Sequence, residues 1–202
     1  IYAFLSMCGP HTGASEAVQK QVAEQCEGKE PFTAIIVDKT AALEEDFGSV
    51  QVDVPYLGHF AQLAQLKHDY PKIKILPSFG GWTMSEPFHA MVKDPKAIKH
   101  FSKTAVELIN QYSFFDGIDL DWEYPGGGGL TTSPWNPETK LSDEQKAFER
   151  GAFTELVKVM RADLDQLSSN TNREYELSTA VGVGAKAAQI DWQAASPYLT
   201  NM

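Results

Sequence analysis

The chain has 202 residues, of which 43% are apolar and 22% are charged, which is typical of one globular domain with a sizeable core. Seventeen Lys and Arg residues against 27 Asp and Glu residues give a formal net charge of −10. An acidic chain repels phosphate, so this balance nearly excludes a nucleic-acid binder. No apolar run approaches the ~20 residues that a membrane-spanning helix requires, so we expect no membrane partner either.

The first half of the chain alternates between segments typical of strands and helices. A short apolar run over residues 2–7 and a β-branched run over residues 32–38 predict two strands. A helix is predicted over residues 53–70 and a third strand over residues 74–79. Pro77 conflicts with the third strand, because proline donates no hydrogen bond to a ladder.

The middle of the chain continues this alternation. Asp94 followed by Pro95 predicts a helix N-cap and first turn, and the apolar residues that follow keep the helical period as far as Tyr112. A fourth strand is predicted over residues 114–123.

The last third begins with a long predicted helix. Ser142 and Gln145 form a capping box at its start. The apolar residues that follow at helical spacing predict a buried stripe of Phe148, Ala152, Leu156, Met160, Leu164 and Leu167. A fifth strand is predicted over residues 174–183, a helix over residues 189–198, and the start of a sixth strand at Asn201.

This alternation predicts an α/β fold with a parallel sheet and right-handed crossovers. A doubly wound sheet and a (β/α)₈ TIM-type barrel both satisfy it. A complete barrel needs ~250 residues, so this chain would hold an incomplete barrel of about five of the eight units.

Three carboxylates alternate along the fourth predicted strand, in the run DGIDLDWE. Asp119, Asp121 and Glu123 share one face, because successive strand side chains point to opposite sides. Asp116 has the other parity and is predicted to be a strand-entry or supporting residue. Carboxylates crowded in a buried strand raise at least one pKa, so one of them can act as an acid near neutral pH. Glu123 comes last, at the carboxyl end of the strand, where parallel α/β folds place their active sites.

Two other interpretations of the acidic run remain open, namely a divalent metal site and a solvated edge strand. The apolar residues that flank and interleave the carboxylates favour a central strand. These residues are Phe114, Phe115, Ile118 and Leu120.

A second pattern, SFGGWT, follows the third predicted strand. The pair Gly80 and Gly81 lets a ligand approach the backbone, and Trp82 offers a flat face on which a sugar ring can stack. Taken alone, the pattern fits an ordinary turn with a core tryptophan better. The glycine run over residues 126–129 has no phosphate-binding context and is predicted to be a flexible loop at the lip of the site.

The two cysteines, Cys8 and Cys26, lack the spacing of a metal site. They could close a disulfide loop in an exported protein or remain buried thiols in a cytosolic one. No G-x-S-x-G motif is present, so serine hydrolysis has no support.

The run DGIDLDWEYP, with SFGGW one strand earlier, resembles glycoside hydrolase family 18 and within it the bacterial chitinases of the chitinase A type. The similarity extends over all 202 residues, including YAFLSMCG, KILPSFGGWT and REYELSTAVG. Members of the family are (β/α)₈ barrels that cleave β-1,4 bonds between N-acetylglucosamine units. The resemblance implies that residues 1–202 are part of a catalytic barrel, from strand 1 to the start of strand 6.

The resemblance also implies roles for individual residues. Glu123 would donate a proton to the glycosidic oxygen, Asp121 would hold the substrate acetamido group, and Asp119 would share the proton of Asp121. The implied sugar-binding positions are Tyr2, Gly80, Gly81, Trp82, Thr83 and Tyr124. Cys8 and Cys26 match the disulfide of the family, which implies a secreted, extracellular bacterial protein.

By resemblance, the reaction is a retaining, substrate-assisted, endo-type hydrolysis of chitin and its oligomers by a monomer that needs no metal or organic cofactor. This chain lacks the family's later M-x-Y-D-type segment and the tryptophan at the floor of its central subsite. Two alternatives stay open. One is an endo-β-N-acetylglucosaminidase that acts on glycoprotein glycans. The other is a chitin-binding lectin, although lectins on this fold typically lose the acid that is present here as Glu123.

Overall fold

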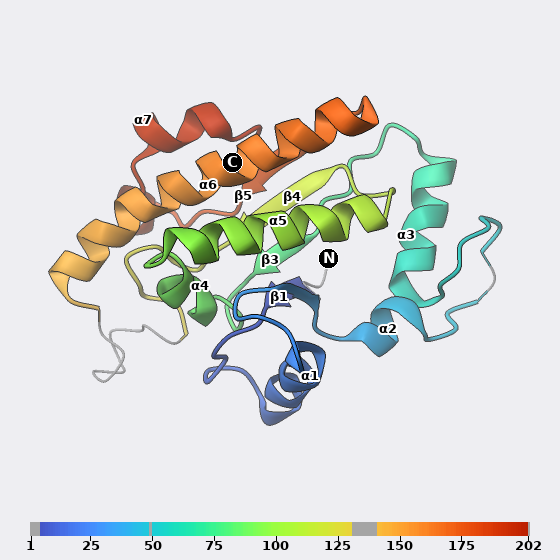
Figure 1. Cartoon of the computed structure of the whole chain (residues 1–202), viewed down its shortest axis with the longest axis horizontal. Helices are drawn as coiled ribbons and strands as arrows, with labels where there is room; N and C mark the ends of the chain where they lie inside the picture. Colours follow the sequence, from blue (N-terminus) through green and yellow to red (C-terminus); the bar gives the residue numbers. More distant parts are fainter. Residues whose placement is uncertain (1–4, 49, 131–140, 202) are drawn as a thin grey trace.

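The computed structural model describes residues 5–48, 50–130 and 141–201, and its centre is a five-stranded sheet in the order β2-β1-β3-β4-β5 (Figure 1). The strands are β1 (Leu5–Met7), β2 (Ala34–Ile36), β3 (Ser78–Gly80), β4 (Gly117–Asp121) and β5 (Glu176–Thr179). Strands β1, β3, β4 and β5 run parallel to one another. This open parallel array is the incomplete barrel that the sequence predicts.

Seven α-helices and two 3₁₀ helices are assigned within the described residues. The α-helices are α1 (Glu16–Cys26), α2 (Lys39–Leu43), α3 (Gly58–Asp69), α4 (Glu86–Met91), α5 (Pro95–Gln111), α6 (Asp143–Thr171) and α7 (Trp192–Ala195), and the 3₁₀ helices are η2 (Gly184–Gln189) and η3 (Ser196–Tyr198). The predicted starts of the two long helices are confirmed. The Asp94 side chain accepts a hydrogen bond from the Lys96 N–H, and Ser142 and Gln145 form both bonds of the capping box. None of these helices is long and apolar enough to cross a bilayer.

The expectation that every strand is parallel is wrong for β2. It pairs antiparallel with β1, with Leu5 opposite Ile36. The reason is the path of α1, whose last residue, Cys26, forms a disulfide with Cys8, the residue that follows Met7 at the end of β1. The chain therefore leaves α1 at the carboxyl end of β1 and runs back beside it. The parallel array holds four strands, and β2 is its antiparallel edge.

The helix predicted over residues 53–70 begins at Gly58, five residues later than expected. Gly58 has a φ of +66°, and a Cβ atom there would lie 2.4 Å from the carbonyl carbon of Ala42. Its N–H donates to the Glu45 carbonyl at 2.8 Å. This close contact with the end of α2 holds the preceding residues outside the helix.

Other boundaries also differ from the predictions. β3 begins at Ser78, directly after Pro77, which agrees with the missing donor of that proline. The predicted helix over residues 189–198 is broken into the end of η2, the short α7 and η3. Asn201 forms an isolated parallel bridge with Ser178 of β5.

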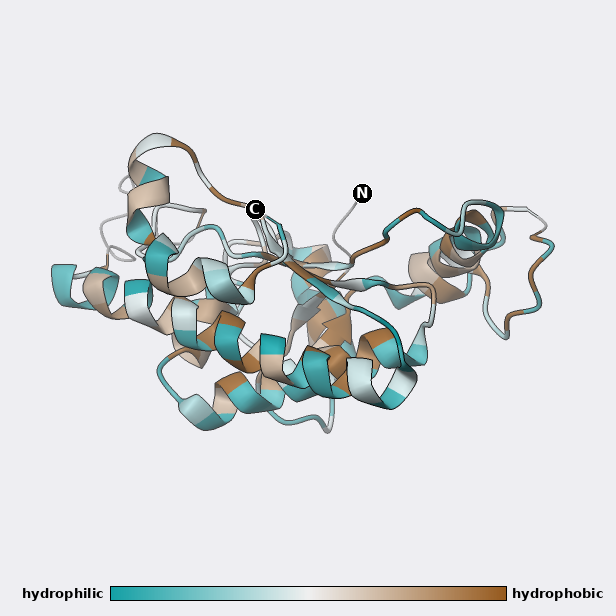
Figure 2. Ribbon diagram, turned by 90° about the horizontal axis from the view of Figure 1, so that it is seen from above, coloured by the Kyte–Doolittle hydropathy of each residue, from teal (hydrophilic) through white to brown (hydrophobic). Residues whose placement is uncertain are grey.

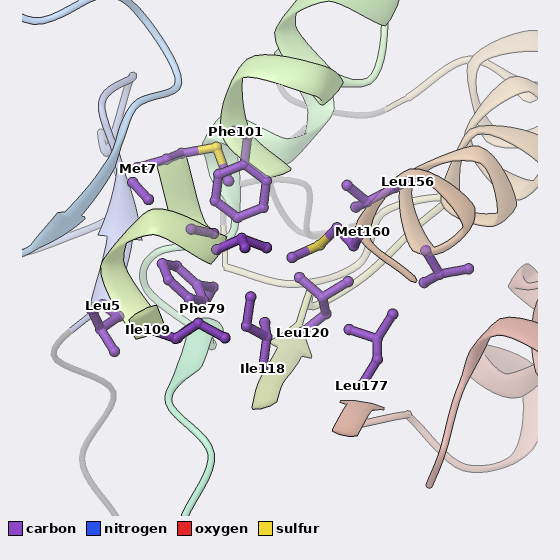
Figure 3. Packing of buried hydrophobic residues seen from close by; sticks show 14 of the residues in the cluster. Leu5, Met7, Phe79, Phe101, Ile109, Ile118, Leu120, Leu156, Met160 and Leu177 are labelled. Atoms are coloured by element: carbon purple, nitrogen blue, oxygen red, sulfur yellow. The ribbon is translucent and has the colours of Figure 1, made fainter. Parts of the chain in front are cut away.

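The main core lies between one face of the sheet and helices α4, α5 and α6. Figure 3 shows side chains from β3, β4 and β5 meeting side chains from α5 and α6: Phe79, Ile118, Leu120 and Leu177 face Phe101, Ile109, Leu156 and Met160. In Figure 2 these long helices lie on one side of the strands. The predicted stripe of α6 is wrong at Phe148, which is 49% exposed, whereas Phe153 is buried.

Because strand side chains alternate, the other face of the sheet carries the residues between the core positions. On β3, β4 and β5 these residues are Gly80, Gly117 and the polar residues Ser78, Asp119, Asp121, Glu176 and Ser178. One face of the parallel strands is thus packed and apolar, and the opposite face presents hydroxyl and carboxyl groups.

Candidate active site

The carboxylates Asp119, Asp121 and Glu123, called the carboxylate row here, follow β4 on its polar side. Ile118, Leu120 and Trp122 alternate with them and are almost completely buried in the core. The three acidic residues are only partly buried. The alternation therefore leaves the carboxylate row accessible at the carboxyl end of β4.

Asp119 is held between two serine side chains from neighbouring strands. Ser78 of β3 and Ser178 of β5 both stand beside Asp119 in the register of the sheet. The Ser78 hydroxyl donates to one carboxylate oxygen at 2.7 Å, and the Ser178 hydroxyl donates to the other at 2.6 Å. Both oxygens of Asp119 thus have a fixed donor, which orients this carboxylate within the row.

Asp121 is the member of the row whose pKa clearly rises. Burial raises the pKa of the Asp121 carboxyl to about 6, and the charges of Glu123 and Asp119 add to the effect. The expectation of at least one raised pKa is confirmed, although burial contributes more than crowding. Near neutral pH, Asp121 is therefore poised to hold or release a proton.

We expect Asp121→Asn to stabilise the protein at about pH 8 and to leave its stability at about pH 4 nearly unchanged. The pKa of Asp121 is higher in the folded chain, about 6, than its ordinary value of 3.8. The folded state therefore loses stability as the pH rises from below the lower value to above the higher one, and an amide avoids this loss. After allowance for the partial solvent exposure of the group, the gain is roughly 1–2 kcal/mol.

Urea unfolding of the full-length natural form of the protein at both pH values measures this difference. An equal effect of the substitution at the two pH values would contradict the raised pKa of Asp121.

Ser85, which the sequence analysis missed, joins the carboxylate row to the turn that carries Trp82. Its buried hydroxyl accepts the Glu123 N–H at 2.9 Å. The same hydroxyl lies 2.8 Å from the Gly81 carbonyl and 3.1 Å from the Asp121 carbonyl, to which it donates. The peptide bond between Glu123 and Tyr124 is cis. Ser85 lies three residues after Trp82 and has no motif of its own, so only the folded contacts reveal its position.

The glycine pair brings this turn against the strand end. Gly80 has a φ of +111°, and a Cβ atom there would lie 2.4 Å from the Asp121 carbonyl oxygen. The Gly81 N–H donates to that same oxygen at 2.7 Å. Trp82 is 50% exposed beside the row, and Thr83 is exposed as well. The interpretation of Trp82 as a core residue is therefore wrong, and its indole is free to stack on a ligand.

Tyr124 directly follows Glu123 in the chain. Burial raises the pKa of the Tyr124 hydroxyl, and a hydrogen bond with Glu123 and the charges of Glu123 and Asp121 raise it further. The Lys186 ammonium lies 5.0 Å from the centre of the Tyr124 ring. A tyrosine in this position presents both a ring face and a hydroxyl beside the carboxylate row.

The remaining predicted residues lie elsewhere or outside the described part of the chain. Tyr2 is outside the described residues. Asp116 is buried, and both of its oxygens lie 2.8 Å from the Lys67 ammonium, with Arg173 at 3.5 Å. This ion-paired group is a supporting residue, as its parity predicts. Over residues 5–48, 50–130 and 141–201, no three His, Cys, Asp or Glu side chains are grouped so that they could hold a metal ion.

A parallel array of strands with carboxylates at the end of β4 is the architecture of a barrel-type glycosidase. The family model described as Glycosyl hydrolases family 18 matches residues 1–201, so the chain belongs to glycosyl hydrolase family 18.

Curated relatives carry chitinase names. Chitinase A of Pseudoalteromonas piscicida is 34% identical over 98% of this chain and 24% of its own length. The probable endochitinase of Orgyia pseudotsugata multicapsid polyhedrosis virus is 35% identical over 100% of this chain and 36% of its own. The chain thus spans about a quarter to a third of these relatives.

Among solved structures, chitinase ChiA74 from Bacillus thuringiensis superposes with a TM-score of 0.77 at 26% identity, covering 98% of this chain and 33% of that one. The chitinase Chi1 of the Yersinia entomophaga toxin complex has a TM-score of 0.72 at 19% identity over 98% of this chain and 39% of its own, which supports the fold alone. These matches confirm the partial TIM-type barrel.

Proposed function

We propose that the protein is a chitinase that hydrolyses β-1,4 bonds between N-acetylglucosamine units in chitin and its oligomers, and that residues 1–202 form part of its catalytic barrel. The observation that carries the proposal is the carboxylate row at the end of β4, with an exposed Trp82 beside it. Membership of family 18 and the chitinase names of relatives support the same substrate class.

The proposed reaction is a retaining, substrate-assisted, endo-type hydrolysis, which is a known exception to the two-carboxylate scheme of most glycosidases. Glu123 protonates the glycosidic oxygen while the 2-acetamido oxygen attacks the anomeric carbon and forms an oxazolinium ion. Asp121 accepts the acetamide N–H and stabilises the developing positive charge. Water then opens the ring with Glu123 as base, so the configuration is retained. Asp119, fixed by Ser78 and Ser178, shares the proton of Asp121.

The sugar-binding surface in this proposal surrounds the carboxylate row. The Trp82 indole stacks on a sugar ring, and Tyr124 contacts the sugar next to Glu123. The full set of proposed sugar-binding positions is Tyr2, Gly80, Gly81, Trp82, Thr83 and Tyr124. Gly80 and Gly81 contribute through their backbone, since neither has a side chain.

We also propose that the protein is a secreted, extracellular bacterial enzyme that acts as a monomer. The disulfide between Cys8 and Cys26 supports export, because such bonds persist in oxidising compartments.

The proposal is tested by incubating the full-length natural form of the protein with chitin oligomers and, separately, with an N-linked glycoprotein. We expect soluble N-acetylglucosamine dimers from chitin and no released glycan. Glycan release without chitin cleavage would indicate an endo-β-N-acetylglucosaminidase instead. Tight chitin binding without any cleavage would indicate a lectin.

A further inference from the structure

Beneath the loop that follows Glu123 lies a buried carboxylate that the proposed reaction does not use. Glu149 belongs to α6 and is 1% exposed. One of its oxygens accepts the Gly126 N–H at 2.8 Å, and the other accepts from Nδ1 of His89 at 2.8 Å. A buried carboxylate is costly unless it is hydrogen-bonded, so these two hydrogen bonds stabilise Glu149 in its buried position.

The Gly126 bond fixes the start of the glycine loop, residues 126–129. The loop is also held by a second side chain, since the Lys186 ammonium donates to the Gly127 carbonyl at 2.8 Å. A Cβ atom at Gly129 would lie 2.0 Å from the Glu123 carbonyl oxygen. The loop is therefore packed directly against the backbone of Glu123, and the expectation of a flexible lip is wrong.

His89 connects Glu149 to the other support of the acid. It lies on α4, whose N-cap residue is Ser85, the side chain that accepts the Glu123 N–H. The His89 ring packs edge-on against Trp122 with ring centres 5.4 Å apart. Its Nε2 atom is buried without a hydrogen-bond partner among the described residues. The Nδ1 contact with Glu149 is therefore the hydrogen bond that orients the His89 ring among the described residues.

We propose that Glu149, oriented by His89, is a positioning residue that holds the glycine loop so that the Glu123 carboxyl group faces the oxygen of the leaving sugar. The inference rests on the proposed function, because it assumes that Glu123 is the acid. Glu149 itself does not contact the substrate. Without it, the Gly126 N–H would be buried and unpaired, and the loop would move to satisfy it. A displacement of about 1 Å in a catalytic group can cost on the order of 10²-fold in rate.

The test compares two substrates in the full-length natural form of the protein. A chitin oligomer has a sugar leaving group that needs a proton from the acid, whereas a dinitrophenyl chitobioside has a leaving group that departs almost without one. For Glu149→Met we expect kcat on the oligomer to fall by on the order of 10²-fold, and kcat on the dinitrophenyl substrate by only about threefold. Glu149→Gln, whose amide oxygen still accepts the Gly126 N–H, should recover most of the loss.

The matched control is Glu155→Met, which removes an exposed carboxylate from the same helix and should leave both rates unchanged. Equal losses on the two substrates, or no loss on either, would overturn the positioning role. A wild-type protein that cleaves neither substrate would instead refute the proposed function.

If Glu149→Met does not fold, His89→Phe serves in its place, because it keeps a ring beside Trp122 and removes the donor to Glu149. We then expect the same unequal loss, larger on the oligomer. An equal loss of kcat on the two substrates for His89→Phe would likewise overturn the inference.

Discussion

Glu123→Gln should lower the rate of chitin hydrolysis by between about 10² and 10⁴-fold, while the affinity for chitin oligomers survives. The amide keeps the shape of the side chain, and the residue's N–H still donates to Ser85 as in the parent chain. The amide cannot give a proton to the leaving oxygen, so the substitution slows the chemical step and leaves binding unchanged. Steady-state hydrolysis and calorimetric binding of a chitin hexamer measure the two quantities on the full-length natural form of the protein.

The matched control for this variant is Glu107→Gln, which changes an exposed glutamate of α5 to the same amide. Its activity should equal that of the wild type. Retention of more than about a tenth of the wild-type rate by Glu123→Gln would contradict the role of Glu123 as general acid.

The carboxylate row is the part of the site that the sequence predicts well, because alternation along a single strand is a local property. The orientation of its carboxyl groups depends on contacts with other strands. Ser78 and Ser178 reach Asp119 only through the register of β3 and β5 beside β4, and a sequence does not state which residues of two distant strands stand opposite each other. Ser85 and Glu149 are hidden for the same reason, since their contacts with the loop end cross elements that are far apart in the chain.

The direction of β2 shows a similar limit for the fold. Its residues have the pattern of any buried strand, and the direction is set by where the preceding helix ends. The disulfide between Cys8 and Cys26 returns the chain to the carboxyl end of β1, which makes an antiparallel neighbour the short path. The direction of β2 therefore cannot be predicted from the residues of the strand itself.

The error at Phe148 has a geometric cause. From Phe148 to Leu164 the predicted stripe of α6 advances in steps of four residues, and each step moves about 40° around the helix. Leu156, Met160 and Leu164 are all fully buried, so the centre of the buried face lies from Leu156 in the direction of Leu164. Phe148, two steps in the opposite direction, therefore lies outside that face. Phe153, three residues before Leu156, lies closer to the buried face and is 1% exposed.

Substrate assistance is the most distinctive part of the proposed mechanism, and it sets a strict demand on the substrate. Asp121 and Glu123 follow the same strand, and both oxygens of Asp119 are engaged by serine hydroxyls. If the protein supplies an acid and an orienting group, the nucleophile must come from the 2-acetamido group of the sugar itself. A sugar with a free amine has no carbonyl oxygen, so fully deacetylated oligomers should survive intact.

The most direct measurement of this claim is the identity of the new reducing ends after digestion of partially deacetylated chitosan. Mass spectrometric sequencing of the products from the full-length natural form of the protein reads each end. The account predicts N-acetylglucosamine at these ends, because only an acetylated sugar on the non-reducing side of the broken bond can attack its own anomeric carbon. Frequent glucosamine at the new ends would show that a protein carboxylate is the nucleophile and would contradict the role proposed for Asp121.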